Sequence, residues 1–243
     1  MLEPIDSGYL FLWGHYARLV ELREKLLGHL TDPYAQAANL GSLGNVYRNL
    51  GQVERAIKVL EEALFFTREI GERAGEGQHL ANLGYAYRFL GQVERAIEFY
   101  EQALAIAREI SDRRSEGARL GHLGHAYLNL RQVEGAIKLY EEALTIAREI
   151  GDRVEEGRRL GNLGFACQVL GQVERANELY EKALAIARET GDRRRESIRL
   201  GSLGTICYFL GQVEQSINLY EDALATAREI YYRRGEIGLW TNP

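Results

Sequence analysis

The chain has 243 residues, of which 46% are hydrophobic and 27% are charged, as in ordinary folded proteins. Its formal net charge of −5 gives no basic field for nucleic acid, and no apolar run approaches the roughly 18–20 residues of a membrane span. From the charge and the lack of a long apolar run we expect neither a nucleic-acid nor a membrane partner. The two cysteines argue for a reducing compartment and against a disulfide framework, so we expect a cytoplasmic protein.

The first 32 residues precede a regular pattern. Residues 14–27 (GHYARLVELREKLL) align with residues 51–64 (GQVERAIKVLEEAL), which belong to that pattern. We therefore expect residues 1–32 to form a degenerate half-repeat that caps the array, with residues 7–13 as the stub of its first helix.

From residue 33 onward the sequence repeats every 40 residues. The phrase LGSLGNVYRNLGQVERAI begins at Leu40 and returns in edited form from Leu80, Leu120, Leu160 and Leu200. A fixed period without insertions predicts that each unit packs on its neighbour in the same way, which is a solenoid. The array divides into five units, at about 33–71, 72–111, 112–151, 152–191 and 192–230.

Each unit is predicted to hold two helices. In the second unit, apolar residues recur every three or four positions over 80–90 and again over 93–107, which is helical spacing. Gly91 marks the turn between them, and an acidic residue after Gly71 is placed to cap the following helix. We call the first helix of a unit helix A and the second helix B.

Every helix A also carries a glycine in its middle, where glycine costs about 1 kcal/mol against alanine. These glycines are Gly44, Gly84, Gly124, Gly164 and Gly204. We expect them to allow close contact with a column of small residues on helix B, which are Ala56, Ala96, Ala136, Ala176 and Ser216.

Residues 231–243 align with the start of a sixth helix A that then stops. This arrangement is expected of a fragment of a longer chain, of an array whose end is covered by another protein, or of an arbitrary boundary. The three alternatives stay open at this point.

The pattern Leu, Leu-Gly and Tyr on helix A, followed by Gly, Ala, Tyr and Ala-Leu on helix B, resembles the tetratricopeptide repeat. That family's usual period is about 34 residues, and the longer period here implies longer helices. The phrasing NLG.AY..LGQ.E.AI..YE.AL.IAREIGDR is similar to the long repeats of GoLoco-containing spindle adaptors, of kinesin light chains and of bacterial signal-transduction ATPases with numerous domains (STAND). The resemblance implies an all-α, right-handed superhelical solenoid of antiparallel helix pairs, with helix A on the concave face. It also implies a non-enzymatic module that binds a protein or peptide and needs no cofactor.

Motifs for chemistry are missing from the sequence. There is no phosphate-binding loop, and the LGNLG phrase lies within a predicted helix rather than after a strand. His122 and His125 could share a metal, but a zinc site needs at least three protein ligands. Cys167 and Cys207 fall on core columns. We therefore expect no catalytic residue and no metal site.

A second stripe on helix A, opposite the core stripe, changes from unit to unit while the core columns barely change. Its amides can pair with an extended backbone, and its aromatic residues can anchor apolar side chains. The predicted peptide-binding groove consists of Asn45, Asn49, Gln78, Asn82, Tyr85, Phe89, His122, His125, Asn129, Arg158, Asn162, Phe165, Ser202 and Phe209. The alternative is an ordinary wetted surface.

One column of helix A is basic. It reads His79, Arg119, Arg159 and Arg199 in successive units. Either neighbouring glutamates (Glu155, Glu156 and Glu196) neutralise it, or it forms a basic rim that attracts an acidic peptide or the phosphates of a nucleotide.

Three functions therefore compete. The first is a scaffold or sensor that binds a peptide in the concave groove. The second is a structural module that self-associates through uncapped ends, and the third is a small-ligand or nucleotide receptor that uses the arginine rim.

Overall fold

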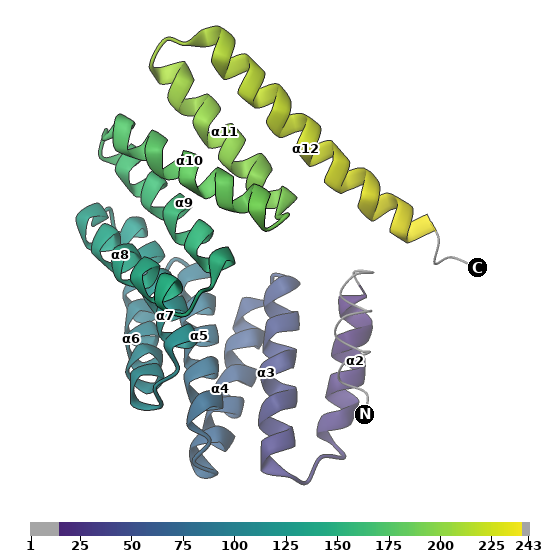
Figure 1. The fold of residues 1–243 in the computed structure, drawn as a ribbon. Helices are drawn as coiled ribbons and strands as arrows, with labels where there is room; N and C mark the ends of the chain where they lie inside the picture. The colour runs from purple at the N-terminus through teal and green to yellow at the C-terminus, as the bar shows by residue number, and fades with distance from the viewer. Residues whose placement is uncertain (1–14, 240–243) are drawn as a thin grey trace. The chain divides into compact units, whose positions relative to one another are not determined.

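The computed structural model describes residues 15–239, with side chains described through residue 230, and all regular structure in that range is helical (Figure 1). In chain order the helices are α2 (Tyr16–Leu27), α3 (Pro33–Asn49), α4 (Val53–Glu69), α5 (Arg73–Phe89), α6 (Val93–Glu109), α7 (Arg113–Asn129), α8 (Val133–Glu149), α9 (Arg153–Val169), α10 (Val173–Glu189), α11 (Arg193–Phe209) and α12 (Val213–Leu239). Helices α3, α5, α7, α9 and α11 are the predicted A helices, and the even-numbered helices from α4 onward are the B helices.

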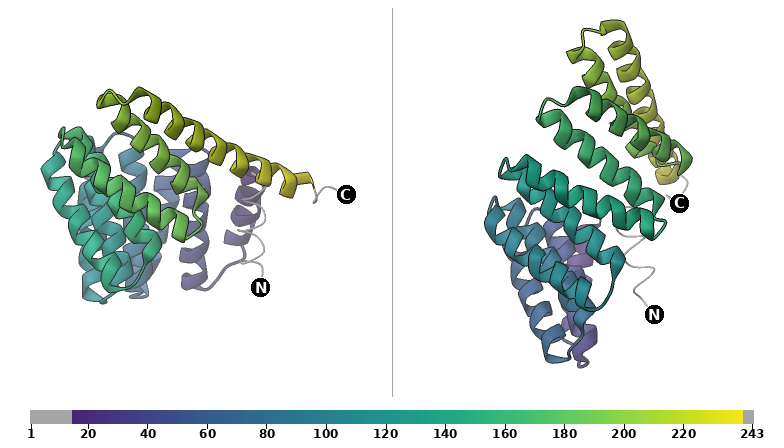
Figure 2. Two further views of the ribbon diagram at one scale, coloured as in Figure 1. Left: turned by 45° about the horizontal axis from the view of Figure 1, so that its top comes forward. Right: turned by 60° about the vertical axis from the view of Figure 1, so that its left-hand side comes forward.

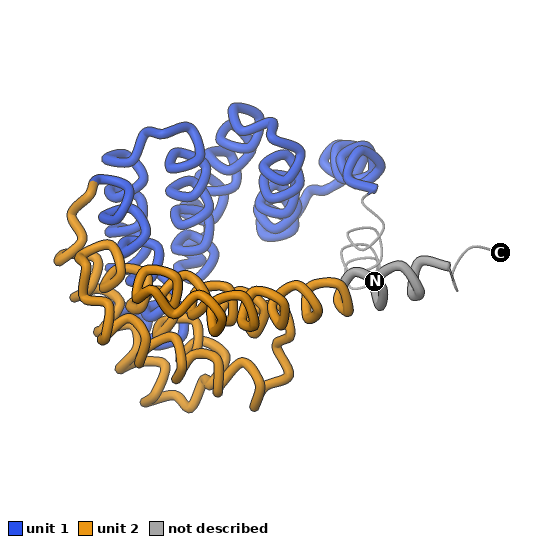
Figure 3. The backbone as a smooth tube through the Cα atoms, turned by 90° about the horizontal axis from the view of Figure 1, so that it is seen from above, with its two compact units in different colours: residues 1–130 blue, residues 131–243 orange. Residues whose placement is uncertain are grey.

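The chain forms two compact units, Met1–Leu130 and Arg131–Pro243 (Figure 3). Within unit 1, each helix from α2 to α7 packs against the next, and successive A helices also touch, α3 against α5 and α5 against α7 (Figure 2). Within unit 2, each helix from α8 to α12 packs against the next. This consecutive pairing confirms the predicted all-α solenoid of helix pairs.

The turns and caps form where the sequence predicts them. Gly51 and Gly91, between helix A and helix B, have φ of 73° and 76°, in the left-handed region that favours glycine. Arg131 and Ser111 take the same conformation without being glycine, with φ of 60° and 57°. At the start of α9, Asp152 accepts a hydrogen bond from the backbone N–H of Glu155 at 3.1 Å, which is the expected cap.

The mid-helix glycines face a different partner from the one predicted. A Cβ atom at Gly84 would lie 2.7 Å from ring carbons of Tyr100, and 3.1 Å from the backbone oxygen of Ala96. Gly164 faces the ring of Tyr180 in the same way. The glycine therefore makes room chiefly for a bulky helix B side chain, and the small residue at Ala96 is a secondary contact.

A buried glutamate near the start of helix A joins the turn to both flanking helices. Glu156 is 8% exposed and accepts from Arg148 Nε at 2.9 Å and Arg153 Nη1 at 2.5 Å. Arg153 also pairs with Glu189 on the next helix B, at 2.5 Å. Glu76, Glu116 and Glu196 repeat the two-arginine contact in the other units. The sequence does not reveal this network, because the same residues are compatible with a solvated face.

The N-terminal end of the array forms a helix where one was predicted, whereas the C-terminal end differs from the prediction. A helix stands at Tyr16–Leu27 and packs on α3, whereas the predicted stub at residues 7–13 lies outside the described residues. The break expected near residue 231 is absent, because α12 continues to Leu239. Tyr231 and Tyr232 stand where earlier units have Gly151 and Asp152, so the turn residue and the cap are both missing.

Candidate functional site

Most of the predicted groove residues lie on the open side of the A helices. Phe89, Phe165 and Phe209 are 63%, 51% and 68% exposed. Asn49, Gln78 and Asn129 are also exposed, and Asn45, Tyr85, His122, His125, Arg158, Asn162 and Ser202 are partly exposed. The stripe is therefore available to a partner within each unit.

Asn82 is the exception among the predicted groove residues. It is only 8% exposed, and its Oδ1 accepts a hydrogen bond from Gln78 Nε2 at 3.2 Å. Because its amide is largely shielded, Asn82 supports Gln78 and offers little surface of its own. Gln78 in turn accepts a hydrogen bond from Arg119 Nη2 at 3.0 Å, which links α5 to α7.

The basic column does not form the solvent-exposed rim that the sequence suggested. Arg119 is 6% exposed and Arg159 is 1% exposed, while Arg199 is half-buried. Burial lowers the pKa of all three guanidinium groups, for Arg159 to about 10. The expectation of a basic rim is therefore wrong for Arg119 and Arg159.

These arginines fill space beside the preceding A helix. Arg199 donates to the backbone oxygen of Gly161 at 3.2 Å, and a Cβ atom at Gly161 would lie 2.5 Å from Arg199 Nη1. Arg159 pairs with Glu155 at 2.9 Å, which confirms one of the neutralising contacts considered above. Glu156 and Glu196 pair instead with arginines at the turns.

A cluster that the sequence analysis missed lies in unit 1, on α3 and α5. The guanidinium carbon of Arg48 lies 4.5 Å from the centre of the Tyr85 ring, and that of Arg88 lies 5.0 Å from the same ring. All three residues are partly exposed. Cation–π contact of this kind holds a guanidinium group in place while leaving its N–H donors available.

Tyr100 of α6 lies under this cluster and is fully buried. Burial raises the pKa of its hydroxyl, and the charge of Arg88, a hydrogen bond from Arg88 and the charge of Arg48 oppose that increase. The signal available in the sequence was the column directly before the last position of the groove stripe, which reads Arg48, Arg88, Leu128, Gln168 and Tyr208. Only the first two 40-residue repeats place arginine there.

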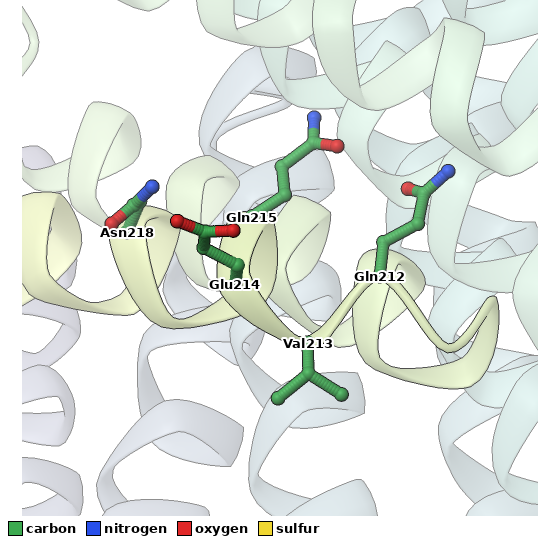
Figure 4. Close-up of a pocket in the computed structure, with 5 residues that line it drawn as sticks. All are labelled: Gln212, Val213, Glu214, Gln215 and Asn218. Atoms are coloured by element: carbon green, nitrogen blue, oxygen red, sulfur yellow. The ribbon is translucent and has the colours of Figure 1, made fainter.

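The last helix pair leaves an apolar face open. Val213, Ile217 and Leu224 of α12 are 56%, 52% and 50% exposed. Their counterparts Val133, Ile137 and Leu144 on α8, which packs against α9, are 7–8% exposed. A shallow depression at the start of α12 is lined by Gln212, Val213, Glu214, Gln215 and Asn218, whose side chains diverge from one another (Figure 4). Divergent groups from one helical turn do not make a binding site.

Other site chemistries find no support in the described part of the chain. Within residues 15–230, no three His, Cys, Asp or Glu side chains come together as metal ligands. Cys167 and Cys207 are free thiols and buried, as their core columns predicted. No helix in the described range is long and apolar enough to cross a membrane.

Known structures share this fold. BtubC (BKLC) from P. vanneervenii superposes with a TM-score of 0.74 at 24% identity, with 90% of each chain covered. The tetratricopeptide-like repeats of a putative kinesin light chain from Podosopora anserina give a TM-score of 0.66 at 25% identity, covering 83% of this chain and 99% of that one. A STAND protein with a tetratricopeptide repeat sensor from Pyrococcus horikoshii gives 0.72 at 21% identity, covering 87% of this chain and 35% of that one.

Sequence comparison agrees with the structural likeness. No curated protein matches the chain significantly. The tetratricopeptide repeat family matches residues 34–109, 118–189 and 159–229, which together make up well over half of the sequence. The chain therefore belongs to the tetratricopeptide repeat family.

Proposed function

We propose that the protein is a non-enzymatic interaction module whose A helices bind an extended peptide segment of a partner protein. The observation that carries the proposal is the contrast between the two sides of helix A. One side holds a nearly invariant buried stripe, and the other presents half-exposed amides together with exposed phenylalanines. Large aromatic side chains left in water beside hydrogen-bonding amides are typical of an interface.

The comparisons support the same class of function. The Pyrococcus structure uses tetratricopeptide repeats as a sensor, so a sensor or scaffold role fits this fold. The two buried free thiols suit a reducing compartment such as the cytoplasm. The burial of Arg119 and Arg159 counts against a nucleotide receptor built on those residues.

A phage library of random 12-residue peptides, selected on the full chain, tests the proposal. Selected peptides are expected to lose affinity at least about fivefold on Phe89→Ala or Phe165→Ala, because each removes an exposed aromatic anchor. Testing the two variants separately shows whether the peptide binds to unit 1, which holds Phe89, or to unit 2, which holds Phe165.

The matched control is Phe65→Ala. Phe65 is 60% exposed, which is similar to the exposure of Phe89 and Phe165, but it lies on a B helix, α4. Its removal should leave affinity unchanged. Failure to enrich any peptide, or equal affinity of the wild type and both groove variants, would overturn the proposal.

The exposed face of α12 favours a second candidate, association of two copies through that face. Sedimentation velocity over a range of concentrations measures it directly. A mass that rises with concentration in the wild type, and not in a Val213→Ser, Ile217→Ser variant, is the result expected of this candidate. A constant monomer mass would discard it.

A further inference from the structure

The Arg48–Tyr85–Arg88 cluster holds two cationic side chains without counterions. Within the described residues, neither Arg48 nor Arg88 forms an ion pair with a carboxylate, whereas the turn arginines Arg68 and Arg73 both pair with Glu76. Arg48 is also half-buried, and burial lowers its pKa. Two partly desolvated like charges on one ring repel each other and are stabilised by an anion that binds both.

The cluster also has an excess of hydrogen-bond donors. The Tyr100 hydroxyl beneath it is buried, and its interaction with Arg88 provides a donor and no acceptor for the hydroxyl proton. Nε of Arg119, whose charge also reaches Tyr100, has no hydrogen-bond partner. Guanidinium groups only donate, so the arginines around Tyr100 cannot accept its proton. Buried donors without acceptors are costly in a folded protein.

The equivalent position in unit 2 is satisfied internally. There the Tyr180 hydroxyl donates to Oε1 of Gln168 at 2.9 Å, and Gln168 occupies the position of Arg88. In the last repeat, the Tyr220 hydroxyl pairs with Thr205 Oγ1 at 2.9 Å. The missing acceptor is therefore a property of the arginine-bearing repeat and is not inherent in the fold.

We propose that this cluster is a carboxylate-binding subsite, at which Arg48 and Arg88 hold an aspartate or glutamate side chain of the bound peptide. The inference rests on the proposed function and names the chemistry that unit 1 selects. A carboxylate supplies both the negative charge and the acceptors that the cluster lacks. Phe89, which directly follows Arg88, is placed to contact an apolar residue beside the acidic one.

The same phage library provides the test. Display at the N-terminus of a coat protein leaves no free peptide C-terminus, so any carboxylate that is selected comes from a side chain. Peptides selected on the wild type are expected to share an Asp or Glu. Those peptides should bind an Arg48→Gln, Arg88→Gln variant about 10- to 100-fold more weakly.

The matched control is Arg55→Gln, Arg95→Gln. These arginines also lie over tyrosines, at 5.9 Å from the Tyr47 ring centre and 4.5 Å from that of Tyr87, but they are exposed on helix B. The control removes the same charge and the same type of contact, and should change affinity less than about threefold. Thermal unfolding of both variants checks that each remains folded.

A peptide-side substitution completes a double-mutant cycle. Changing the shared acidic residue to its amide should weaken binding to the wild type and have little effect on the Arg48→Gln, Arg88→Gln variant, because the interaction is already lost there. Coupling between the two changes supports the subsite.

The outcomes separate this inference from the function on which it rests. Peptides that depend on Phe89 but show no acidic preference, or that bind the arginine variant normally, overturn the subsite and leave the proposed function intact. Failure to select any peptide overturns both.

Discussion

Gly164 on α9 lies directly against the ring of Tyr180 on α10. A Cβ atom at Gly164 would be 2.7 Å from two ring carbons of Tyr180, closer than side-chain carbons pack. Gly164→Ala gains about 1 kcal/mol of helix propensity but forces the two helices apart, which costs about 1–3 kcal/mol. We expect a net loss of stability, measured as a lower denaturation midpoint in urea. An unchanged or higher midpoint would show that the joint has room to spare.

Gly201 provides the opposite case on α11. It also lies inside an A helix, but a Cβ atom there would meet nothing within 4 Å. Gly201→Ala should therefore raise the free energy of unfolding by about 0.5–1 kcal/mol, through helix propensity alone. The second 40-residue repeat already carries alanine at this position, as Ala81. The same urea titration checks it, and a loss of stability would contradict the open space seen here.

The buried glutamate of each turn should contribute more to the free energy of unfolding than a surface ion pair does. Glu156→Gln keeps the shape of the side chain but weakens its hydrogen bonds to Arg148 and Arg153. Both arginines are about half exposed, so solvent reduces the effect, and we expect a loss of about 1–2 kcal/mol. Chemical denaturation of the full chain measures it.

The matched control is Glu141→Gln. Glu141 pairs with Arg175 at 2.8 Å, but both side chains are about half exposed. Such pairs contribute little, so this variant should lose less than about 0.5 kcal/mol. Equal losses in the two variants would mean that burial of Glu156 adds nothing.

The regular features of the fold were predictable from sequence because they depend on local chemistry. Helix spacing, the glycine at Gly91 and the cap at Asp152 each act within a few residues. The burial of the arginine column was not predictable in this way. Arg199 is half-buried because Gly161, 38 positions earlier, leaves space beside it, and only the approach of α11 to α9 brings the two together.

The candidate site shows the same division. The exposure of Phe89 and Phe165 follows from their position opposite the core stripe, which the helical period fixes. Arg48 and Arg88 lie one position outside that stripe, so their pairing on Tyr85 depends on the contact between α3 and α5. The lack of an acceptor at Tyr100 is visible only once its surroundings are known.

The turn glutamates also predict how stability changes in acid. Burial alone would raise the pKa of Glu116 and Glu156, but hydrogen bonds from their arginines outweigh it, and each pKa lies below its ordinary value of 4.5. The unfolded chain therefore takes up protons before the folded chain does, so the stabilisation is present above about pH 4.5 and is lost as pH falls below it. Unfolding titrations between pH 6 and 3 should show a shallower acid loss in a Glu116→Gln, Glu156→Gln variant. An unchanged acid slope would rule out this contribution.

His79 acts in a separate and higher pH window. It is 6% exposed, lies against Gly41 of α3, and burial lowers its pKa to about 4. In the unfolded chain its pKa is about 6.5, so between these values the unfolded state binds a proton that the folded state does not. Stability should fall by up to about 1.4 kcal/mol per pH unit from pH 6.5 toward 4.

Substitution isolates this histidine from the other four. His79→Gln should flatten the decline between pH 6.5 and 4 without changing the steeper loss below pH 4.5 that comes from the glutamates. His29→Gln is the control, because His29 is exposed and its removal leaves the burial of His79 intact. Urea midpoints at half-unit pH steps resolve the two windows. A decline that persists in His79→Gln and disappears in His29→Gln would show that the proton is taken up elsewhere, and that His79 is not the buried neutral group of α5.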